Sequence, residues 1–371
     1  MKRILKTIMY ILIAIIILII GFIYFLGKSD QVGTLASGER LKRMESSKTF
    51  KASVFENIEN TPSLKEGVSQ TAVLKTFFFG KEKNNVPKNP LPVIQTDLKN
   101  LDPNEDLIVW FGHSSYYIQI EGKRILVDPV FSKYASPVPV GIKAFPMTYE
   151  YQAADLPPID LLIITHDHWD HLDYPTFQKI KNTTKAVVTS LGVGSHLEKW
   201  GYPAKQIHEL YWGEDVILEG IQFRATPARH FSGRWFKRNT SLWSSFILSS
   251  SDYKLFLGGD SGYGKHFKEI GEQYGPFDLA ILENGQYNEL WKYIHLMPEE
   301  AIQAAEDLKA SKVMPVHNSK FPLANHNWDE PLIRISQEAK RKNSTLWTPQ
   351  IGQITYLNKP NQFKEWWKDI N

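Results

Sequence analysis

The sequence contains no cysteine among its 371 residues. Disulfide bonds and thiolate metal sites are therefore excluded. Any metal ion must be held by histidine nitrogen and carboxylate oxygen, a donor set that suits zinc, iron or manganese. The absence of cysteine is compatible with an exported protein but does not require export.

An excess of charge of one sign is also missing. The chain has 43 Lys and Arg residues against 40 Asp and Glu residues, and the formal net charge of +3 is spread along its length. Proteins that bind nucleic acid concentrate basic residues in a stripe or patch. We therefore expect no nucleic-acid partner.

One long apolar run stands at the N-terminus. Residues 7–27 carry no charge and are mostly Ile, Leu and Phe. At ~1.5 Å per residue, a helix of this length spans a ~30 Å hydrocarbon core. A cleaved signal peptide has a shorter apolar region of roughly 7–15 residues followed by small residues, whereas Phe22, Tyr24 and Phe25 stand here. We predict a retained, single-pass membrane anchor over residues 1–27.

Charges that flank the run favour one orientation. Lys2, Arg3 and Lys6 precede it, which favours an N-terminus inside and a catalytic domain on the extracytoplasmic side. Lys28 and Arg40 lie just beyond the run and weaken this preference.

The rest of the chain divides into three parts. Residues 28–100 carry no catalytic motif and are interpreted as an extension or linker. We favour a spacer or wrap between membrane and domain; the alternative is a cap over the active site or a dimer contact. Residues 101–358 form a domain of α/β or α+β class, with sheets covered by helices. Residues 359–371 form a C-terminal tail that we expect to pack on the domain rather than lie at a membrane surface.

Short apolar or alternating runs predict the strands of this domain. These runs lie at residues 107–111, 115–120, 124–128, 161–165, 185–190, 221–226, 243–250, 253–257 and 312–316. Helices are predicted at 38–44, 174–181 and 195–200 and after 297–300.

A dense cluster of metal-ligand side chains follows the run at 161–164. The sequence there is Thr165-His-Asp-His-Trp-Asp-His-Leu-Asp173. Histidines two residues apart on a turn leaving a strand can bind one cation, and Asp170 and His171 can reach a second. Burying so many polar groups without a metal ion or other partners would cost much free energy. The stretch therefore predicts a metal site.

The spacing His-x-His-x-Asp-His resembles the signature of the metallo-β-lactamase superfamily. That family takes its remaining ligands from a later His, an Asp and a final His, each at a strand end, and His230, Asp260 and His317 stand in such positions. The resemblance implies a four-layer αββα sandwich with a binuclear metal centre at one edge of the sheets. We expect two zinc ions, with iron or manganese as alternatives.

The resemblance also implies a role for each ligand. The first ion is held by His166, His168 and His230, the second by Asp170, His171 and His317, and Asp260 bridges the two. Such a pair can share a hydroxide that acts as the nucleophile, and Asp170 stands where the family places a catalytic proton handler. Asp167 and Asp173 are interpreted either as residues that orient the ligands or as solvated or helix-capping residues.

Other segments resemble the N-acylphosphatidylethanolamine-hydrolysing phospholipase D group. They include Trp110-Phe-Gly-His113-Ser-Ser, Gly259-Asp-Ser-Gly-Tyr263 and His295-Leu-Met-Pro-Glu-Glu-Ala301, and the likeness runs from about residue 75 to residue 335. It implies hydrolysis of a phosphodiester in a membrane phospholipid. The sequence departs from that group after the last ligand, where His317-Asn-Ser-Lys-Phe321 replaces Trp-Gly-Thr.

Four further residues are candidates for contact with the substrate: His113, His295, Arg234 and Trp235. His113 and His295 lie in segments of the resembled group, and Arg234 can pair with phosphate oxygens. The other histidines are interpreted as surface or satisfied core residues, namely His196, His208, His266 and His326.

Two alternative functions stay open. A lactonase or amidase, resembling the ascorbate-6-phosphate lactonase branch, would need a small polar pocket, whereas cleavage of a phospholipid or other apolar ester needs an apolar groove. A non-catalytic binding protein that retains the fold would have lost ligands, yet all seven ligand positions are filled. A homodimer is compatible with either enzyme.

Overall fold

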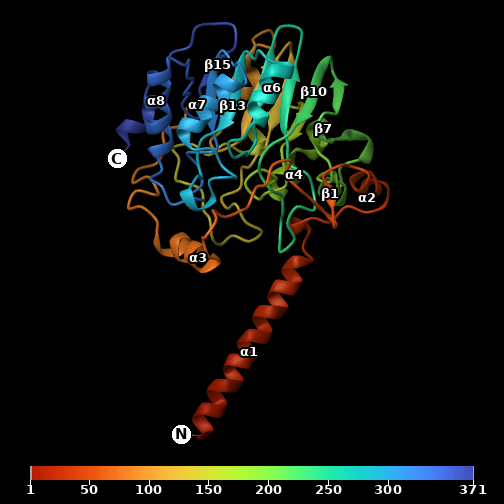
Figure 1. Ribbon diagram of the computed structural model, residues 1–371, viewed down its shortest axis with the longest axis vertical. Helices are drawn as coiled ribbons and strands as arrows, with labels where there is room; N and C mark the ends of the chain where they lie inside the picture. The colour runs from red at the N-terminus through yellow and green to blue at the C-terminus, as the bar shows by residue number, and fades with distance from the viewer. Residues whose placement is uncertain (1, 371) are drawn as a thin grey trace.

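Helix α1 (Lys2–Gly27) projects away from the rest of the molecule in the computed structural model, which describes residues 2–370 (Figure 1). Residues Arg3–Gly27 have a mean hydropathy of 3.0, and this stretch is not buried against the body. By length and composition the helix could therefore cross a membrane.

The first sheet has seven strands in the spatial order β15-β3-β4-β5-β6-β7-β8. Pairs from β15 to β5 are antiparallel, and pairs from β5 to β8 are parallel. β3, β4 and β6 are almost fully buried because both faces of the sheet are covered. The strands are β3 (Leu107–Trp110), β4 (Tyr116–Ile120), β5 (Lys123–Val127), β6 (Ile159–Ile164), β7 (Thr184–Ser190), β8 (Ile207–Leu210) and β15 (Ile354–Tyr356).

The second sheet has six strands in the order β14-β13-β12-β11-β10-β9. Its β12, β13 and β14 pair in parallel and the remaining pairs are antiparallel. The strands are β9 (Asp215–Leu218), β10 (Ile221–Thr226), β11 (Ser245–Ser249), β12 (Lys254–Leu257), β13 (Leu279–Glu283) and β14 (Val313–Val316).

The two sheets pack face to face, and helices cover both outer faces. Ile118 and Ile163 of the first sheet share one core with Phe223 and Ile281 of the second. Each such buried side chain contributes about 1.5–3 kcal/mol to folding. The outer helices are α4 (Tyr174–Ile180) and α5 (Gly194–Lys199) on the first sheet and α6 (His266–Tyr274), α7 (Pro298–Asp307) and α8 (Glu330–Lys342) on the second. The predicted αββα order is confirmed.

Residues 28–100 wrap around this sandwich. They form α2 (Gly38–Glu45), the short pair β1 (Phe50–Lys51) and β2 (Val54–Phe55), and α3 (Gln70–Phe79). Met44 and Phe55 are fully buried in a core shared with Leu191 and Trp243 of the domain. Single 3₁₀ turns lie at Asp30–Val32, Leu98–Asn100, Ala153–Asp155, Lys181–Thr183, Ala204–Gln206, Glu289–Trp291 and Trp366–Asp369.

The C-terminal tail packs on the domain, as expected. Trp366 and Trp367 are buried, and both belong to the core between the two sheets.

Candidate metal centre

Strand directions bring the carboxyl ends of strands from both sheets to one edge of the sandwich. In the first sheet β3, β5 and β6 point the same way, and in the second sheet β10, β12 and β14 do. Polar residues follow each of these ends. They are His113 after β3, Asp128 after β5, His166 to His171 after β6, His230 after β10, Asp260 after β12 and His317 after β14.

These residues form two groups. Within each group the candidate ligand atoms lie within 4.8 Å of one another. One group is His166, His168, His230 and Asp260, and the other is His113, Asp170, His171 and His317. All seven predicted ligands are thus brought together in the two predicted sets, and His113 joins the second.

Asp260 lies between the two groups. Its Oδ2 is 3.8 Å from His166 Nε2 and 3.2 Å from His171 Nε2, and its Oδ1 is 3.2 Å from His317 Nδ1. One carboxylate therefore faces both groups, as a bridging ligand must.

Hydrogen bonds fix the orientation of the rings. His171 Nδ1 lies 2.8 Å from Asp128 Oδ2, and Thr165 donates to the same carboxylate through its N–H and its hydroxyl. His230 Nδ1 lies 2.8 Å from the carbonyl oxygen of Ile294. When Nδ1 donates to an oxygen, Nε2 is left with its lone pair towards the site.

Three site residues adopt left-handed backbone conformations that side chains other than glycine rarely adopt. The φ angles of His113, Asp128 and His317 are +53°, +40° and +64°. Such residues cluster at functional sites, where the surrounding structure holds them. Here His113 N–H donates to the Asn318 carbonyl and His317 N–H donates to the His113 carbonyl, which joins the two sheets.

The donor set fits metal ions. His168 Nε2, His171 Nε2 and Asp260 Oδ1 are buried and make no hydrogen bond with any residue that the structure describes. Orphaned polar atoms cost about 1–3 kcal/mol each, and a cation that they coordinate removes that cost. Nitrogen and carboxylate donors are those that zinc, iron and manganese accept.

Burial and neighbouring charges set the protonation of the cluster. Burial lowers the pKa of His166 and His230 well below the ordinary value, so both rings are neutral and have a free lone pair. Burial would raise the pKa of Asp260, but His171 and His317 lower it well below the usual range. Burial opposes protonation of His171, but Asp260 and Asp170 raise its pKa well above the ordinary value. A cation at this position would replace that proton.

Two predicted contact residues lie beside the metal-ligand groups. His113 is fully buried, and its Nε2 is 2.8 Å from Asp170 Oδ2, so it orients this acid. His295 lines a cavity of about 820 Å³ that the ligands also line, with its Nδ1 2.7 Å from the buried carboxylate of Glu283. Burial raises the pKa of Glu283 to about 8, and although burial alone would lower the pKa of His295, Glu283 raises it to about 9.

The other two predicted contact residues face elsewhere. Arg234 is buried with 3% of its surface exposed, and its guanidinium donates to the carbonyls of Asp167, Leu172 and Gln31. A Cβ at Gly27 would lie 2.9 Å from Trp235 Nε1, so this ring packs against the end of α1. Neither residue lines the cavity at the metal-ligand groups.

The cavity of about 820 Å³ is lined by residues of both metal-ligand groups. Apolar side chains form much of its wall, and one guanidinium, Arg238, belongs to the lining. The extension contributes Ser63, Leu64 and Val73, so part of residues 28–100 covers the site, as the alternative interpretation of this segment held. The remaining lining residues are His168, Asp170, Phe231, Asp260, Gln286, Trp291, Ile294, His295, His317 and Leu323.

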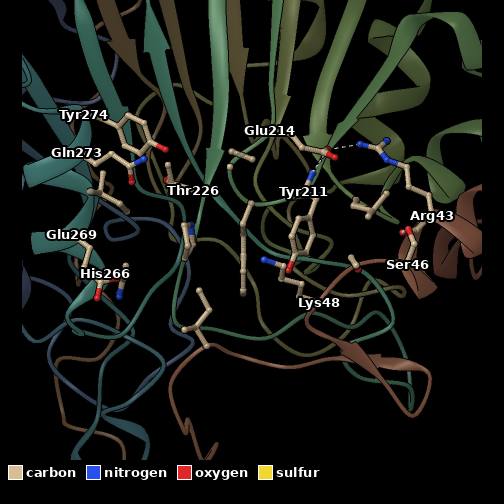
Figure 2. Close-up of a pocket in the computed structure, with 18 residues that line it drawn as sticks. Arg43, Ser46, Lys48, Tyr211, Glu214, Thr226, His266, Glu269, Gln273 and Tyr274 are labelled. Carbon is tan, nitrogen blue, oxygen red and sulfur yellow. Dashed lines mark hydrogen bonds and ion pairs between the residues drawn. The ribbon is translucent and has the colours of Figure 1, made fainter.

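A second cavity of about 530 Å³ lies between α2 and α6. Figure 2 shows Arg43 and its ion-pair partner Glu214 on one side of this cavity, and His266 and Glu269 of α6 on the other. His266 is satisfied, because its Nε2 lies 3.1 Å from Ser261 Oγ. None of the candidate metal groups found among the described residues lies there, so the chemistry belongs to the larger cavity.

The two remaining acids of the His-rich stretch point away from the ligands. Asp167 accepts hydrogen bonds from Gly233 N–H and Ser241 Oγ. Asp173 accepts from Thr176 Oγ1 and Ser132 N–H at the start of α4. They hold the loop, each in its own surroundings, and neither bonds a ligand ring directly.

The sequence did not single out Asp128 or Glu283 as site residues, and it placed Arg238 only within the basic and aromatic segment around Arg234. Asp128 and Glu283 each end an apolar run whose strand reaches the same edge as the ligands. That position was the available signal. Arg238 is exposed and follows Arg234 by four residues, and no pattern separates the two.

Comparisons with known proteins agree with this geometry. The profile of the family described as "Beta-lactamase superfamily domain" matches residues 123–318. An uncharacterised protein of Mycobacterium tuberculosis is 34% identical, over 87% of this chain and 88% of its own. N-acyl-phosphatidylethanolamine-hydrolyzing phospholipase D 1 of Caenorhabditis elegans is 27% identical, over 81% of this chain and 92% of its own.

Solved structures share the fold. Igni18, a metallo hydrolase of Ignicoccus hospitalis, superposes with a TM-score of 0.53 at 20% identity, over 70% of this chain and 100% of its own. The family match covers more than half of the chain, and it spans His166, His230 and Asp260 as well as His317. The chain therefore belongs to the β-lactamase superfamily and is a metallo-β-lactamase-fold hydrolase.

Proposed function

We propose that this protein is a membrane-anchored, two-metal phosphodiesterase that cleaves N-acylated phosphatidylethanolamine into an N-acylethanolamine and a phosphatidic acid. The seven ligands are those predicted from the sequence, and zinc is the metal that we propose. The observation that carries the proposal is the cavity at the metal-ligand groups.

The cavity suits an apolar substrate. Leu64, Phe231, Trp291 and Ile294 line a space of about 820 Å³ together with Asp170 and Asp260. Apolar lining with a few convergent polar groups is typical of lipid and cofactor sites. A small sugar lactone would leave these apolar side chains uncovered, which disfavours the lactonase alternative.

One cation in the cavity can bind the phosphodiester. Arg238 belongs to the lining, and its guanidinium lies over the Phe231 ring at 4.8 Å. Guanidinium groups bind phosphate oxygens in a bidentate manner. We assign to Arg238 the role that the sequence suggested for Arg234.

The chain's own residues prepare the reaction. The ligand residues would hold two divalent ions, which when bound would activate a water and polarise the phosphoryl oxygen. One carboxylate oxygen of Asp170 lies 2.8 Å from His113 Nε2. We propose that Asp170 accepts the proton of the attacking water. The buried histidines and Asp260 would hold the two ions, and the apolar walls exclude other water.

The position of the cavity supports a substrate drawn from a bilayer. Helix α3, whose Val73 lines the cavity, lies on the side of the body from which α1 leaves (Figure 1). Phe79 at the end of α3 is 84% exposed, and Phe236, next to the Trp235 that packs on α1, is 76% exposed. Exposed aromatic side chains are favourable at a membrane interface. The C. elegans relative, named for hydrolysis of the same lipid, points to the same substrate class.

The test is hydrolysis by the full chain in vesicles that contain N-acylphosphatidylethanolamine, run in ¹⁸O-labelled water. Attack at phosphorus places the label in phosphatidic acid and leaves the N-acylethanolamine unlabelled. We expect the activity to be lost with a chelator and in His166→Ala, and to be retained in His208→Ala, a histidine on β8 remote from the site.

Other outcomes overturn the proposal in distinct ways. Label in a released carboxylate would show an amidase or esterase. Turnover of lactones without lipid cleavage would favour the lactonase alternative. Lipid cleavage that survives both the chelator and His166→Ala would contradict a metal-dependent reaction.

A further inference from the structure

The chain segment that leaves the membrane helix is bonded to the back of the metal site. Residues 29–34 follow α1 directly, and their backbone groups meet α5 and its flank. Lys199 Nζ donates to the Gly33 carbonyl at 2.9 Å, Trp200 Nε1 to the Asp30 carbonyl at 2.7 Å, and Ser195 Oγ to the Thr34 carbonyl at 2.9 Å. Backbone groups outside regular structure rarely find this many side-chain partners unless the segment is held in one place.

A histidine passes this contact to the ligand loop. Thr34 N–H donates to His196 Nδ1 at 3.0 Å, so the neutral ring must carry its proton on Nε2. That nitrogen lies 3.3 Å from Asp167 Oδ2, and Asp167 stands between the proposed ligands His166 and His168. His196 is buried, so the chain Thr34–His196–Asp167 is shielded from water.

The Arg234 guanidinium also links residues 29–34 to the ligand loop. Arg234 Nη1 donates to the Asp167 carbonyl at 2.9 Å and to the Leu172 carbonyl at 2.6 Å, which closes both ends of the loop. Its Nη2 donates to the Gln31 carbonyl at 2.8 Å, and its guanidinium lies 3.9 Å from the centre of the Trp169 ring.

We propose that residues 29–34 act as a latch that positions the metal-ligand loop of residues 165–173, with His196 and Arg234 as the positioning residues. The retention of metal ions then depends on how the chain leaves the membrane helix. This inference rests on the metal site proposed above, but the contacts that carry it involve no metal ion.

Gly33 makes the latch testable by one methyl group. Its φ is +80°, and a Cβ there would lie 2.0 Å from His196 Nδ1, so Gly33→Ala must displace the ring. Gly220, in the turn between β9 and β10, has a similar φ of +87° and no atom within 4 Å of its would-be Cβ. Gly220→Ala therefore carries the same backbone strain without the clash and serves as the matched control.

The experiment uses the full chain in detergent micelles or lipid nanodiscs. The first readout is the rate at which a chelator removes zinc. The second is amide hydrogen exchange of residues 165–173 in the metal-free chain. We expect Gly33→Ala to release zinc at least tenfold faster and to exchange faster in this loop, because partners behind the ligands tune metal affinity by about 10- to 100-fold. Gly220→Ala should match the wild type in both readouts.

Arg234→Lys is the second variant. A lysine ammonium keeps the charge but cannot span the three carbonyls, so it should repeat the effect of Gly33→Ala. Equal exchange of the loop in wild type, Gly33→Ala and Arg234→Lys would overturn the latch. If the wild type binds no zinc but the variants still exchange faster in the loop, the latch stands and the proposed function fails.

Discussion

Lys320 is a buried cation at the point where this sequence departs from the phospholipase D group. It is 7% exposed, and its Nζ donates to the Val130 carbonyl. Burial lowers its pKa from the ordinary 10.5 to about 8. Between these two pH values the unfolded chain holds a proton that the folded chain has released, so this residue makes the free energy of unfolding rise with pH.

We therefore expect Lys320→Met to stabilise the metal-free protein at pH 7. The difference from wild type should shrink by on the order of 1–3 kcal/mol as the pH rises from 8 to 10. Urea unfolding followed by tryptophan fluorescence measures it. Lys133→Met, at a lysine with a 65% exposed side chain, is the control and should show no such trend. A constant difference across this pH range would contradict the account.

Asp128 orients the His171 ring, and its replacement tests whether this orientation matters for metal binding. Asp128→Asn keeps the shape but weakens acceptance of the bond from His171 Nδ1, so the ring can turn its lone pair away from the site. We expect zinc affinity to fall by about 10- to 100-fold. Competition with a chromophoric chelator gives the value. Asp252→Asn, in the exposed turn before β12, should bind as the wild type does; equal affinities in all three proteins would remove Asp128 from the site.

At the residue scale, the proximity of the seven proposed ligands was predictable. Histidines and acids directly after apolar runs have few structural uses, and their order matched a known signature. Arg234 was assigned to the cavity for its chemistry alone, and it lies behind the loop instead. The part played by His196 was unpredictable, because its partner Thr34 is 162 residues away in the sequence.

Among the structural elements, the packing of the C-terminal tail on the domain can be tested by mutation. Trp367 has no exposed surface and lies in the core between the sheets. Trp367→Ala should lower the free energy of unfolding by about 3–5 kcal/mol. Lys368→Ala, at a neighbour with a 55% exposed side chain, should change it by less than about 0.5 kcal/mol. A Trp367→Ala variant as stable as wild type would contradict packing of the tail on the domain and favour a tail at the membrane surface.

Element by element, most of the interior strands were predicted, whereas the interior strand β13 and the edge strands β8, β9 and β15 were not. β6 and β7 were found because both of their faces are covered. β8, β9 and β15 lie at or near the sheet edges, where short strands with exposed positions carry little periodic signal. Helix α3 was missed because its sequence, Gln-Thr-Ala-Val-Leu-Lys-Thr-Phe-Phe-Phe, has no polar face to distinguish it from a strand.

At the scale of the whole molecule, the orientation in the membrane stays a prediction. The absence of cysteine allows a clean test, because Lys88→Cys would be the sole thiol and lies at an exposed position. In spheroplasts of an expressing bacterium, a membrane-impermeant maleimide should label this variant without lysis. Labelling only after lysis would place the body in the cytoplasm.

The central claim is a two-ion centre bridged by Asp260. The most direct measurement is the number of metal ions bound per full-length chain, by elemental analysis of wild type and Asp260→Asn after loading with zinc. We expect two ions in the wild type and fewer in the variant, because the Asp260 carboxylate, which the variant lacks, faces both ligand groups. A wild type that binds no ion or one ion, or an Asp260→Asn chain that retains both, would contradict it.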